Sequence, residues 1–476
     1  MRDWDAARIA RAAGARLLAE AAGARARVGP LAATVDSRTL APGELFVGLR
    51  GDRADGGSFA AQALREGAWG VIVTPEHAEV AVAAATQGAV LAHADPLAGM
   101  QALARAWRRE LAASGAKVVA ITGSTGKTST KDILAALFGG GARTAASPAN
   151  LNTEIGLPLA ILSAPPDTER VVLEMAMRGP GQIAELTAIA EPDVGVIVNV
   201  GPAHLELLGS LEAVAAAKAE LIAGLAAGAS VVVPAGEPLL APHLRADLNT
   251  ITFGEDAEVS LVQRLPDGRV RIRAGSALIE LWPSFDQAHH INNLLAAVAA
   301  ARALGHAPEG RLQVSFSARR GERLALATGV VVIDDCYNAN PMSMRAAIDD
   351  LAATASERRV AVLGDMLELG VLGPALHREI GAHASEQGVD VLVAVGPLAR
   401  EIAASFAGEA HSMGDATAAA ALLPALLRAG DTVLVKGSRG VGLERVVAAL
   451  AQAHGPGSTD VDGPRVLAPG AVPGRR

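Results

Sequence analysis

The sequence predicts an α/β protein of about two to four domains, and three observations support this fold class. The chain has 476 residues, which is too long for a single hydrophobic core. Half of its residues are apolar, so several cores can be buried. Alanine-rich helical stretches alternate with short Val/Ile runs, which is the pattern of helices layered on sheets. We therefore expect parallel sheets that are covered by helices.

The composition argues against a nucleic-acid partner, a disulfide framework and a membrane span. The net charge is −8 with 7 Phe, 4 Trp and 1 Tyr, whereas nucleic-acid binding calls for basic patches and stacking aromatics. Cys336 is the only cysteine, as expected in a reducing compartment. No apolar run approaches the ~18 residues of a membrane span, and the first residues do not resemble a signal peptide. We predict a cytoplasmic protein.

Three α/β units and a tail are expected along the chain. The first unit covers residues 1–112 and includes a strand at 70–73. The second has a strand that starts at Lys117 and further strands at 171–175, 194–200 and 230–233. The third starts at about residue 318, with strands at 330–335, 360–365, 391–396 and 432–437. Residues 456–476 are rich in Gly and Pro, which predicts a disordered tail.

The segment 118–130, Val-Val-Ala-Ile-Thr-Gly-Ser-Thr-Gly-Lys-Thr-Ser-Thr, is the most informative part of the chain. A β-branched run stops at a glycine-rich turn and a helix follows, so backbone N–H groups would face an anion. Lys127 would reach the β- and γ-phosphates, and the Thr128 hydroxyl would bind Mg²⁺. Ile121 stands where the strict Walker pattern has glycine, so the first glycine of this variant is Gly123. We interpret the loop as a nucleoside triphosphate site; a Gly/Ser turn with a surface lysine is the alternative.

Glu174, His204 and Lys218 are candidates for a metal site near this loop. Glu174 ends an apolar strand, where a carboxylate can bind Mg²⁺, although a solvated acid is the alternative. His204 falls in a loop at the same edge of the sheet, but a lone loop histidine is usually just exposed. Ser210 can cap a helix that places Lys218 among alanines. Spacing alone favours a surface lysine paired with an acid.

Short polar residues gather after the first predicted strand of the third unit, in Asp334-Asp335-Cys336-Tyr337-Asn338-Ala339-Asn340-Pro341. Two acids and two asparagines at a strand terminus are typical of a site that binds hydroxyls or a ribose. The only tyrosine lies in the same segment. Cys336 is interpreted as a small buried residue, because its neighbours do not suggest a nucleophile.

Together these segments resemble the Mur ligases, the ATP-dependent amide ligases of peptidoglycan precursor synthesis. The chain is most similar to the member that adds D-alanyl-D-alanine, and the matching signatures stand at 36–38, 42–47, 150–158, 335–341, 363–370 and 436–439. The resemblance runs from about residue 30 to residue 450. It implies three domains: a smaller UDP-substrate-binding α/β domain at 1–112, a central P-loop ATPase-like domain with a parallel sheet at 113–317, and a Rossmann-like ligase domain at 318–455.

The resemblance also implies roles for individual residues. Catalytic residues would be Lys127, Glu174, His204 and Lys218, and two Mg²⁺ ions would be held by Thr128, Glu174, His204 and Lys218. Lys218 stands where the family has a carbamylated lysine, formed when a neutral amine reacts with CO₂ and becomes an anion. ATP would contact Gly123, Ser124, Thr125, Gly126, Lys127, Thr128, Ser129, Asn293, Arg320 and Asp335. The other substrates would contact Ser37, Arg38, Phe46, Asn150, Asn152, Tyr337, Asn338, Asn340 and His377.

Three segments depart from the family pattern. The resemblance assigns His289 and Asn293 to the adenine side of the ATP site. Gln287-Ala288-His289-His290 stands in place of the family's Gly-Arg-His-Asn, which weakens that assignment. Asp55-Gly56-Gly57 replaces Asp-Gly-His in the first domain. Ala176 follows Glu174-Met175, where the family often has glycine after Met. The residues that carry the expected chemistry are all present.

The implied reaction joins UDP-MurNAc-tripeptide to D-Ala-D-Ala and converts ATP to ADP and phosphate. ATP first phosphorylates the terminal carboxylate, and the dipeptide amine then displaces phosphate from the acyl phosphate. A monomer is expected, and the third peptide residue, diaminopimelate or lysine, stays open. One alternative is another Mur-type or folylpolyglutamate-type ligase that adds a single amino acid, which the 337–341 loop argues against. The other is a nucleotide-binding switch, for which a second metal site would be superfluous.

Overall fold

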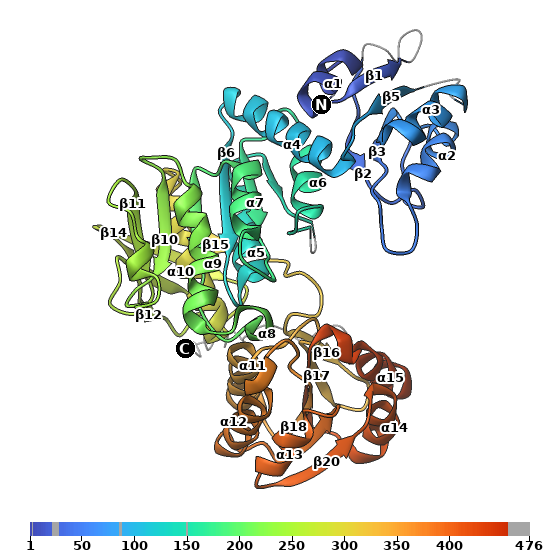
Figure 1. Ribbon diagram of the computed structural model, residues 1–476. Coiled ribbons are helices and arrows are strands. Elements are labelled where there is room, and N and C mark those ends of the chain that lie inside the picture. The colour runs from blue at the N-terminus through green and yellow to red at the C-terminus, as the bar shows by residue number, and fades with distance from the viewer. Residues whose placement is uncertain (2, 21–27, 85–87, 149–150, 456–476) are drawn as a thin grey trace, which may run out of the picture.

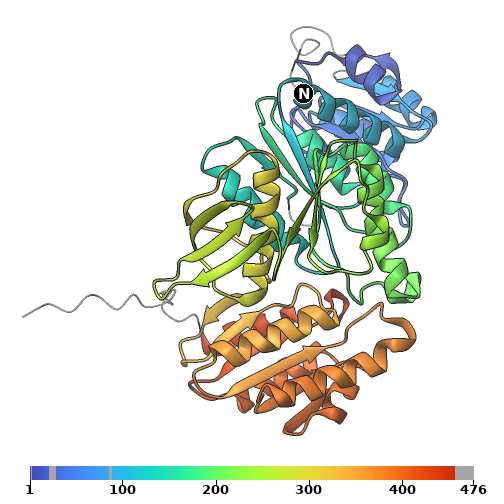
Figure 2. The ribbon, with the colours of Figure 1, turned by 90° about the vertical axis from the view of Figure 1, so that its left-hand side faces the viewer.

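The chain forms three α/β domains in a row, each built on its own β-sheet (Figures 1 and 2). This computed structural model describes residues 1, 3–20, 28–84, 88–148 and 151–455. The predicted α/β class is confirmed, and the sheets use residues 16–92, 117–312 and 322–436. The domain boundaries at 112 and 317 stay predictions, and the tail expected at 456–476 lies outside the described residues.

The N-terminal domain is built on a five-stranded sheet in the order β1-β5-β4-β3-β2. Neighbouring strands are parallel, except that β1 is antiparallel to β5. The inner strands β3, β4 and β5 are buried along their whole length, as expected for short apolar runs covered on both faces. The strands are β1 Arg16–Ala19, β2 Ala33–Thr34, β3 Leu45–Val47, β4 Gly70–Val73 and β5 Ala89–Ala92, and the helices are α1 Ala6–Ala13, α2 Ala60–Arg65 and α3 Pro75–Ala84.

The central domain has a ten-stranded sheet in the order β15-β14-β13-β12-β11-β10-β9-β6-β8-β7. Strands β6 to β11 are parallel to their neighbours, as predicted. The expected parallel arrangement is interrupted at β13, which is antiparallel to both β12 and β14 because tight turns with left-handed Gly268 and Gly275 join these strands; β12 is still parallel to β11, and β14 to β15. The strands are β6 Lys117–Thr122, β7 Thr144–Ala146, β8 Arg170–Glu174, β9 Val194–Ile197, β10 Ser230–Pro234, β11 Asn249–Phe253, β12 Val259–Arg264, β13 Val270–Ala274, β14 Ala277–Pro283 and β15 Gly310–Leu312.

Helices cover both faces of the central sheet. On one face α5 and α10 pack against each other around Phe138 and Leu294. On the other face α7 and α9 pack around Leu186 and Leu221. The helices are α5 Lys127–Gly139, α6 Gly156–Ser163, α7 Gln182–Ala190, α8 Leu205–Leu208, α9 Leu211–Gly224 and α10 Ala288–Ala303. Ser210 caps α9, as predicted, by accepting a hydrogen bond from the Ala213 N–H at 3.2 Å.

The C-terminal domain has a six-stranded sheet in the order β16-β17-β21-β18-β19-β20. The four predicted strands are present, and they are joined by β20 and by β16, which is antiparallel to β17. The strands are β16 Glu322–Ala325, β17 Val331–Asp334, β18 Arg359–Gly364, β19 Val391–Val395, β20 Glu409–Met413 and β21 Thr432–Lys436. The helices are α11 Pro341–Thr354, α12 Gly373–Glu386, α13 Arg400–Ser405, α14 Ala416–Leu426 and α15 Glu444–His454.

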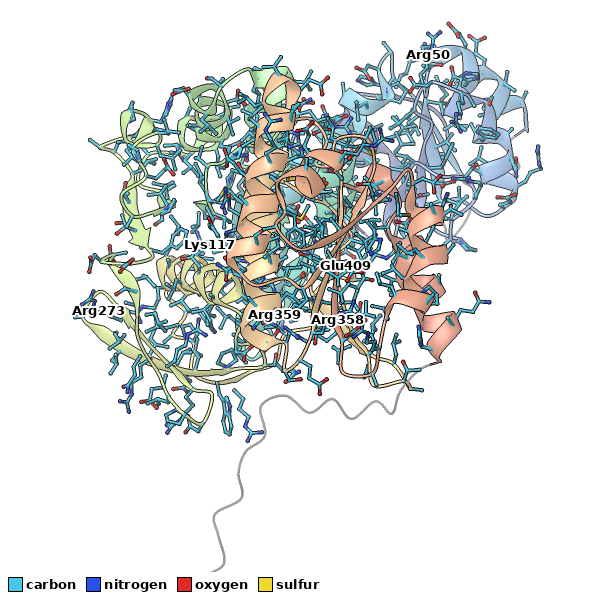
Figure 3. All side chains as sticks on the ribbon, turned by 90° about the horizontal axis from the view of Figure 1, so that it is seen from below. Arg50, Lys117, Arg273, Arg358, Arg359 and Glu409 are labelled. Carbon is cyan, nitrogen blue, oxygen red and sulfur yellow. The ribbon has the colours of Figure 1, made fainter. Side chains whose placement is uncertain are left out.

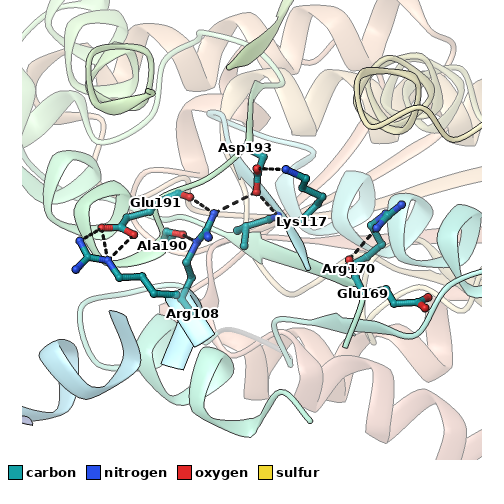
Figure 4. Close-up of polar contacts among 9 residues, drawn as sticks. Arg108, Lys117, Glu169, Arg170, Ala190, Glu191 and Asp193 are labelled. Atoms are coloured by element: carbon teal, nitrogen blue, oxygen red, sulfur yellow. Dashed lines mark hydrogen bonds and ion pairs between the residues drawn. The ribbon is translucent and has the colours of Figure 1, made fainter. Parts of the chain in front are cut away.

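Helix α4, Pro96–Ala113, ties the first two domains together. The buried Arg108 side chain donates from Nε to the Ala190 carbonyl oxygen at 2.8 Å and contacts the Asp193 carboxylate at 3.1 Å (Figure 4). Lys117, at the start of β6, reaches the same carboxylate at 2.9 Å. A single apolar cluster also runs from Trp107 into the central domain. The N-terminal and central domains therefore share one core.

The C-terminal domain is packed more independently. Its buried apolar residues form two clusters of their own, one on each face of its sheet. Viewed from the C-terminal domain, Arg358, Arg359 and Glu409 of that domain lie in front of the central domain, and Arg273 and Arg50 of the other two domains lie at opposite edges of the molecule (Figure 3).

Within the described residues, no helix is both long enough and apolar enough to span a bilayer.

Candidate active site

The phosphate loop lies between β6 and α5, as the sequence predicts. Gly126 has a φ of 77°, a left-handed conformation that glycine adopts without strain. Helix α5 begins at Lys127, so its first N–H groups are available to an anion. The Lys127 Nζ donates to the Gly123 carbonyl oxygen at 2.8 Å. The lysine is therefore folded over its own loop.

Asn199, which follows β9, holds the loop in shape. Its Oδ1 accepts hydrogen bonds from the backbone N–H groups of Ser124 and Thr125, each at 3.0 Å. Its Nδ2 donates to the Thr125 carbonyl oxygen at 3.1 Å. The Ser124 hydroxyl donates to the Gly201 carbonyl oxygen at 2.9 Å. Residues that follow β9 thus hold the phosphate loop in its conformation.

Glu174, at the end of β8, is buried directly beside this loop. The Thr128 hydroxyl donates to its Oε2 at 2.7 Å, and Asn152 Nδ2 donates to its Oε1 at 2.8 Å. Burial lowers the pKa of the Lys127 ammonium, and the negative charge of Glu174 acts in the opposite direction. A hydroxyl and a carboxylate next to a phosphate loop are the oxygen ligands that Mg²⁺ prefers. Within the described residues, three or more His, Cys, Asp or Glu side chains do not converge on one metal site.

Lys218, on α9, is buried, and within the described residues it has no acidic partner. The residue is 1% exposed, although its sequence spacing alone favoured a surface lysine. Burial lowers the pKa of its ammonium well below the usual value, and the charge of Lys127 lowers that pKa further. A neutral amine is therefore favoured at this position.

His204, which precedes α8, lies at the border with the C-terminal domain. Its Nδ1 is 2.5 Å from Glu368 Oε2 of that domain. Burial lowers the pKa of the His204 imidazole, and the Glu368 charge acts in the opposite direction.

The C-terminal domain contributes polar side chains to the same site. Asn340 caps α11 through Ser343, and its Nδ2 donates to the Ser124 carbonyl oxygen across the domain border at 3.1 Å. Asp335 forms an ion pair with the buried Lys436 at 2.6 Å. The Asn340 contact brings the 335–341 segment against the phosphate loop.

Arg320 approaches the site from the chain that links the two domains. Its guanidinium carbon lies 4.3 Å from the centre of the Tyr337 ring, a cation–π arrangement. The guanidinium carbon of Arg439, in the Lys-Gly-Ser-Arg segment, lies 5.7 Å from the centre of the same ring. Both arginines line the same cavity as the phosphate loop, so positive charge is concentrated there.

Two adjoining cavities open between the central and C-terminal domains. The larger has a volume of about 650 Å³, and its lining includes Lys127, Thr128, Asn152, Glu174, His204, Arg320, Tyr337, Asn338 and Asn340. The smaller, of about 220 Å³, is lined by Ser129, His289, Asn293 and Asp335 among others. Thr125, Gly126 and Arg320 line both. The phosphate loop therefore stands where the two cavities meet.

Several predicted residues lie elsewhere. Phe46 is buried in the core of the N-terminal domain. His377 was predicted to bind substrate, but its ring is fully buried, and both ring nitrogens contact backbone groups, Met366 N at 2.9 Å and Gly373 O at 2.7 Å. Ser37 and Arg38 lie in an N-terminal loop, and neither lines a cavity described above. Asn150 lies outside the described residues, and Lys218 lies outside both cavity linings.

Comparison with known proteins gives the family. Residues 32–108 match the Mur ligase family catalytic domain, residues 121–301 the Mur ligase middle domain and residues 319–439 the Mur ligase glutamate ligase domain. A UDP-N-acetylmuramoyl-tripeptide–D-alanyl-D-alanine ligase from Synechocystis sp. is 38% identical over 423 residues, with 87% of this chain and 90% of the relative covered. The chain belongs to the Mur ligase family.

Other relatives of this Mur ligase agree. A protein of the same name from Bacillus subtilis is 35% identical and covers 87% of the chain and 91% of its own length. The structure of MurF from Acinetobacter baumannii matches with a TM-score of 0.80 and 27% identity, covering 94% of this chain and 99% of that one. The MurF ligase from Thermotoga maritima in complex with ADP matches with a TM-score of 0.75 and 30% identity, covering 89% and 97%. The resemblance predicted from the motifs is confirmed.

Sequence reasoning about this Mur ligase missed Asn199, Glu368 and Arg439 as parts of the site. Asn199 follows an apolar strand, and an amide at a strand end could have drawn attention to it. Glu368 and Arg439 lie in the signature segments 363–370 and 436–439. Their neighbours along the chain do not reveal that Glu368 contacts His204 and that Arg439 lies over the Tyr337 ring.

Proposed function

We propose that this Mur ligase joins D-alanyl-D-alanine to UDP-N-acetylmuramoyl-tripeptide with conversion of ATP to ADP and phosphate. The observation that carries the proposal is a shared cavity. The phosphate loop and Glu174 open onto the same space as Asn338 and Asn340 of the C-terminal domain. A nucleotide and an acceptor can therefore meet there, and the names of the relatives support these substrates.

The chemistry requires that a poor electrophile be activated. The γ-phosphoryl group is transferred to the terminal carboxylate of the tripeptide, and ADP leaves. The dipeptide amine then attacks the acyl carbon, the bond to phosphate breaks, and the amine loses a proton. In the first step Lys127 and Arg320 neutralise charge on the phosphoryl oxygens, and the N–H groups at the start of α5 orient the phosphoryl group. The smaller cavity, with Asn293 and Asp335, would accept the nucleoside.

The residues present fit a magnesium requirement. Thr128 and Glu174 would hold an ion beside the phosphate loop, because their oxygens are already 2.7 Å apart at that place. His204, which lines the same larger cavity, would serve a second ion. When bound, Mg²⁺ supplies positive charge to the phosphoryl oxygens.

Lys218 is proposed as a carbamylated residue. Its burial and the nearby Lys127 charge favour the neutral amine, the form that attacks CO₂. The new N–C bond yields a carbamate and one proton, and the anion formed would balance the charge of Lys127. We also retain the expectation that the protein acts as a monomer in the cytoplasm.

Phosphate release is the experiment that tests the proposed function. Release from Mg-ATP is measured with UDP-MurNAc-tripeptide alone, with D-Ala-D-Ala alone and with both, and the product is identified by mass spectrometry. The proposal requires release that depends on both substrates and a pentapeptide product. Release that depends on a free amino acid instead would indicate a different amide ligase, and its absence with every acceptor would favour a nucleotide switch.

A further inference from the structure

The C-terminal domain reaches His204 through one glutamate. Glu368 Oε2 is 2.5 Å from His204 Nδ1, and the Glu368 carbonyl oxygen accepts a hydrogen bond from the Glu206 N–H at 3.1 Å. Both partners have left-handed backbones, with φ of 63° at Glu368 and 57° at His204. Residues other than glycine rarely adopt this backbone conformation unless the surrounding contacts hold them in it. Two residues with strained backbones are thus in contact across the domain border.

The loop that carries Glu368 is held rigidly from within its own domain. The buried His377 ring accepts from the Met366 N–H at 2.9 Å, and the Ser438 hydroxyl accepts from the Leu367 N–H at 2.9 Å. Asp365 accepts from the Ala399 N–H at 2.7 Å. These contacts immobilise the residues just before Glu368. Its position is thus set by the C-terminal domain as a whole, which gives the 363–370 signature and His377 a structural purpose.

We propose that Glu368 is a positioning residue that fixes the ring of His204 when the central and C-terminal domains are in contact. A carboxylate only accepts hydrogen bonds, so His204 Nδ1 carries the hydrogen of this contact. The lone pair of the neutral ring is then at Nε2, on a side chain that lines the larger cavity. Carboxylates that orient a histidine in this way are common beside metal ions.

The consequence is a link between domain position and the site. His204 belongs to the central domain and Glu368 to the C-terminal domain, so separation of the domains frees the ring to rotate and to change tautomer. His204 is then correctly set only when Asn340 and Arg320 have also been brought to the phosphate loop. This inference rests on the proposed function for its catalytic meaning, whereas the contact itself can be tested without it.

The decisive experiment uses the full chain and the variant Glu368→Gln, which keeps the side-chain shape and loses the charge. Glu206→Gln is the matched control, because Glu206 is an exposed acid two residues from His204 whose side chain does not contact that ring. Nitrogen-15 NMR of histidine-labelled protein, assigned with His204→Gln, reports the ring tautomer without metal or substrate. We expect the Nδ1–H tautomer in the wild type and in Glu206→Gln, and a mixture in Glu368→Gln.

Kinetics provide the second measurement. We expect kcat/KM to fall by about 10- to 100-fold in Glu368→Gln, with a higher Mg²⁺ concentration needed for half-maximal rate. Thermal melting establishes that the variant is folded. An unchanged His204 tautomer, or a rate and Mg²⁺ dependence equal to those of Glu206→Gln, would overturn the proposal. If the wild type lacks ligase activity, the proposed function fails, while the tautomer measurement still decides whether Glu368 sets the ring.

Discussion

Replacement of Gly126 by alanine would test how tightly the phosphate loop is packed against helix α10. The left-handed φ of 77° at this position costs an alanine about 1–2 kcal/mol. The added Cβ would also lie 2.6 Å from Asn293 Oδ1, well inside contact distance. Asn293 is 5% exposed, so its amide must leave its rotamer, which costs about 0.5–1.5 kcal/mol more. We expect the free energy of unfolding to fall by about 2–3 kcal/mol.

Urea unfolding and ADP binding by calorimetry are the assays for this variant. Gly139→Ala is the matched control at the last residue of α5, where an added Cβ would have no neighbour within 4 Å. We expect that control to be neutral or more stable by about 0.4–1 kcal/mol. Because the clash displaces Asn293, ADP binding should weaken in Gly126→Ala and not in Gly139→Ala.

A double variant separates the two contributions. Asn293→Ala removes the atom that the new Cβ would meet, so Gly126→Ala should cost less in that background than in the wild type. The strain of the left-handed backbone should remain. If Gly126→Ala unfolds within about 0.5 kcal/mol of Gly139→Ala and binds ADP as tightly, the packing argument is wrong.

Four further outcomes are expected. Lys127→Ala should abolish phosphate release with little change in melting temperature, because this loop cation does not pack in a core; a normal rate would refute the ATP assignment. Lys218→Ala should be inactive and partly restored by acetate, and full activity without acetate would make the lysine dispensable. The pKa of Lys218 is lowered in the folded chain, so this lysine lowers the free energy of unfolding as pH falls below its usual pKa of 10.5, and this cost is absent above that pH. In CO₂-free buffer Lys218→Met should therefore be more stable than the wild type at pH 7, by a margin that shrinks toward pH 10.5, and a margin that does not vary with pH would contradict this. Asp132→Ala removes the carboxylate that lies 2.9 Å from the buried Lys131 ammonium, which keeps its hydrogen bond to the Ser147 carbonyl oxygen, and it also frees Ser317. It should cost about 3 kcal/mol, against under about 1 kcal/mol for the exposed Asp167→Ala; equal losses in urea would refute the argument.

Local sequence patterns predicted the parts of this protein that depend on neighbouring residues. The Val/Ile runs located the parallel strands of the central and C-terminal sheets, because short apolar runs fit strands covered on both faces. The glycine–lysine–threonine loop located the phosphate site, because its conformation and its chemistry are encoded within a few residues. Ser210 as a helix cap follows the same logic.

Contacts between distant segments could not be read in this way. Lys218 and His377 have ordinary neighbours along the chain. Only packing shows that Lys218 is a buried amine with no acidic partner in the part of the chain that the structure describes, and that His377 braces the 366–370 loop.

The amino-acid sequence by itself therefore determined the fold class, the family and the position of the phosphate loop, since each rests on short-range patterns. The three-dimensional structure decided which residues share the cavity. Asn340 and Ser124 are 216 positions apart, and His204 and Glu368 are 164 positions apart. Such pairs form only when whole domains dock, because the position of each side chain is then set by every contact of its domain.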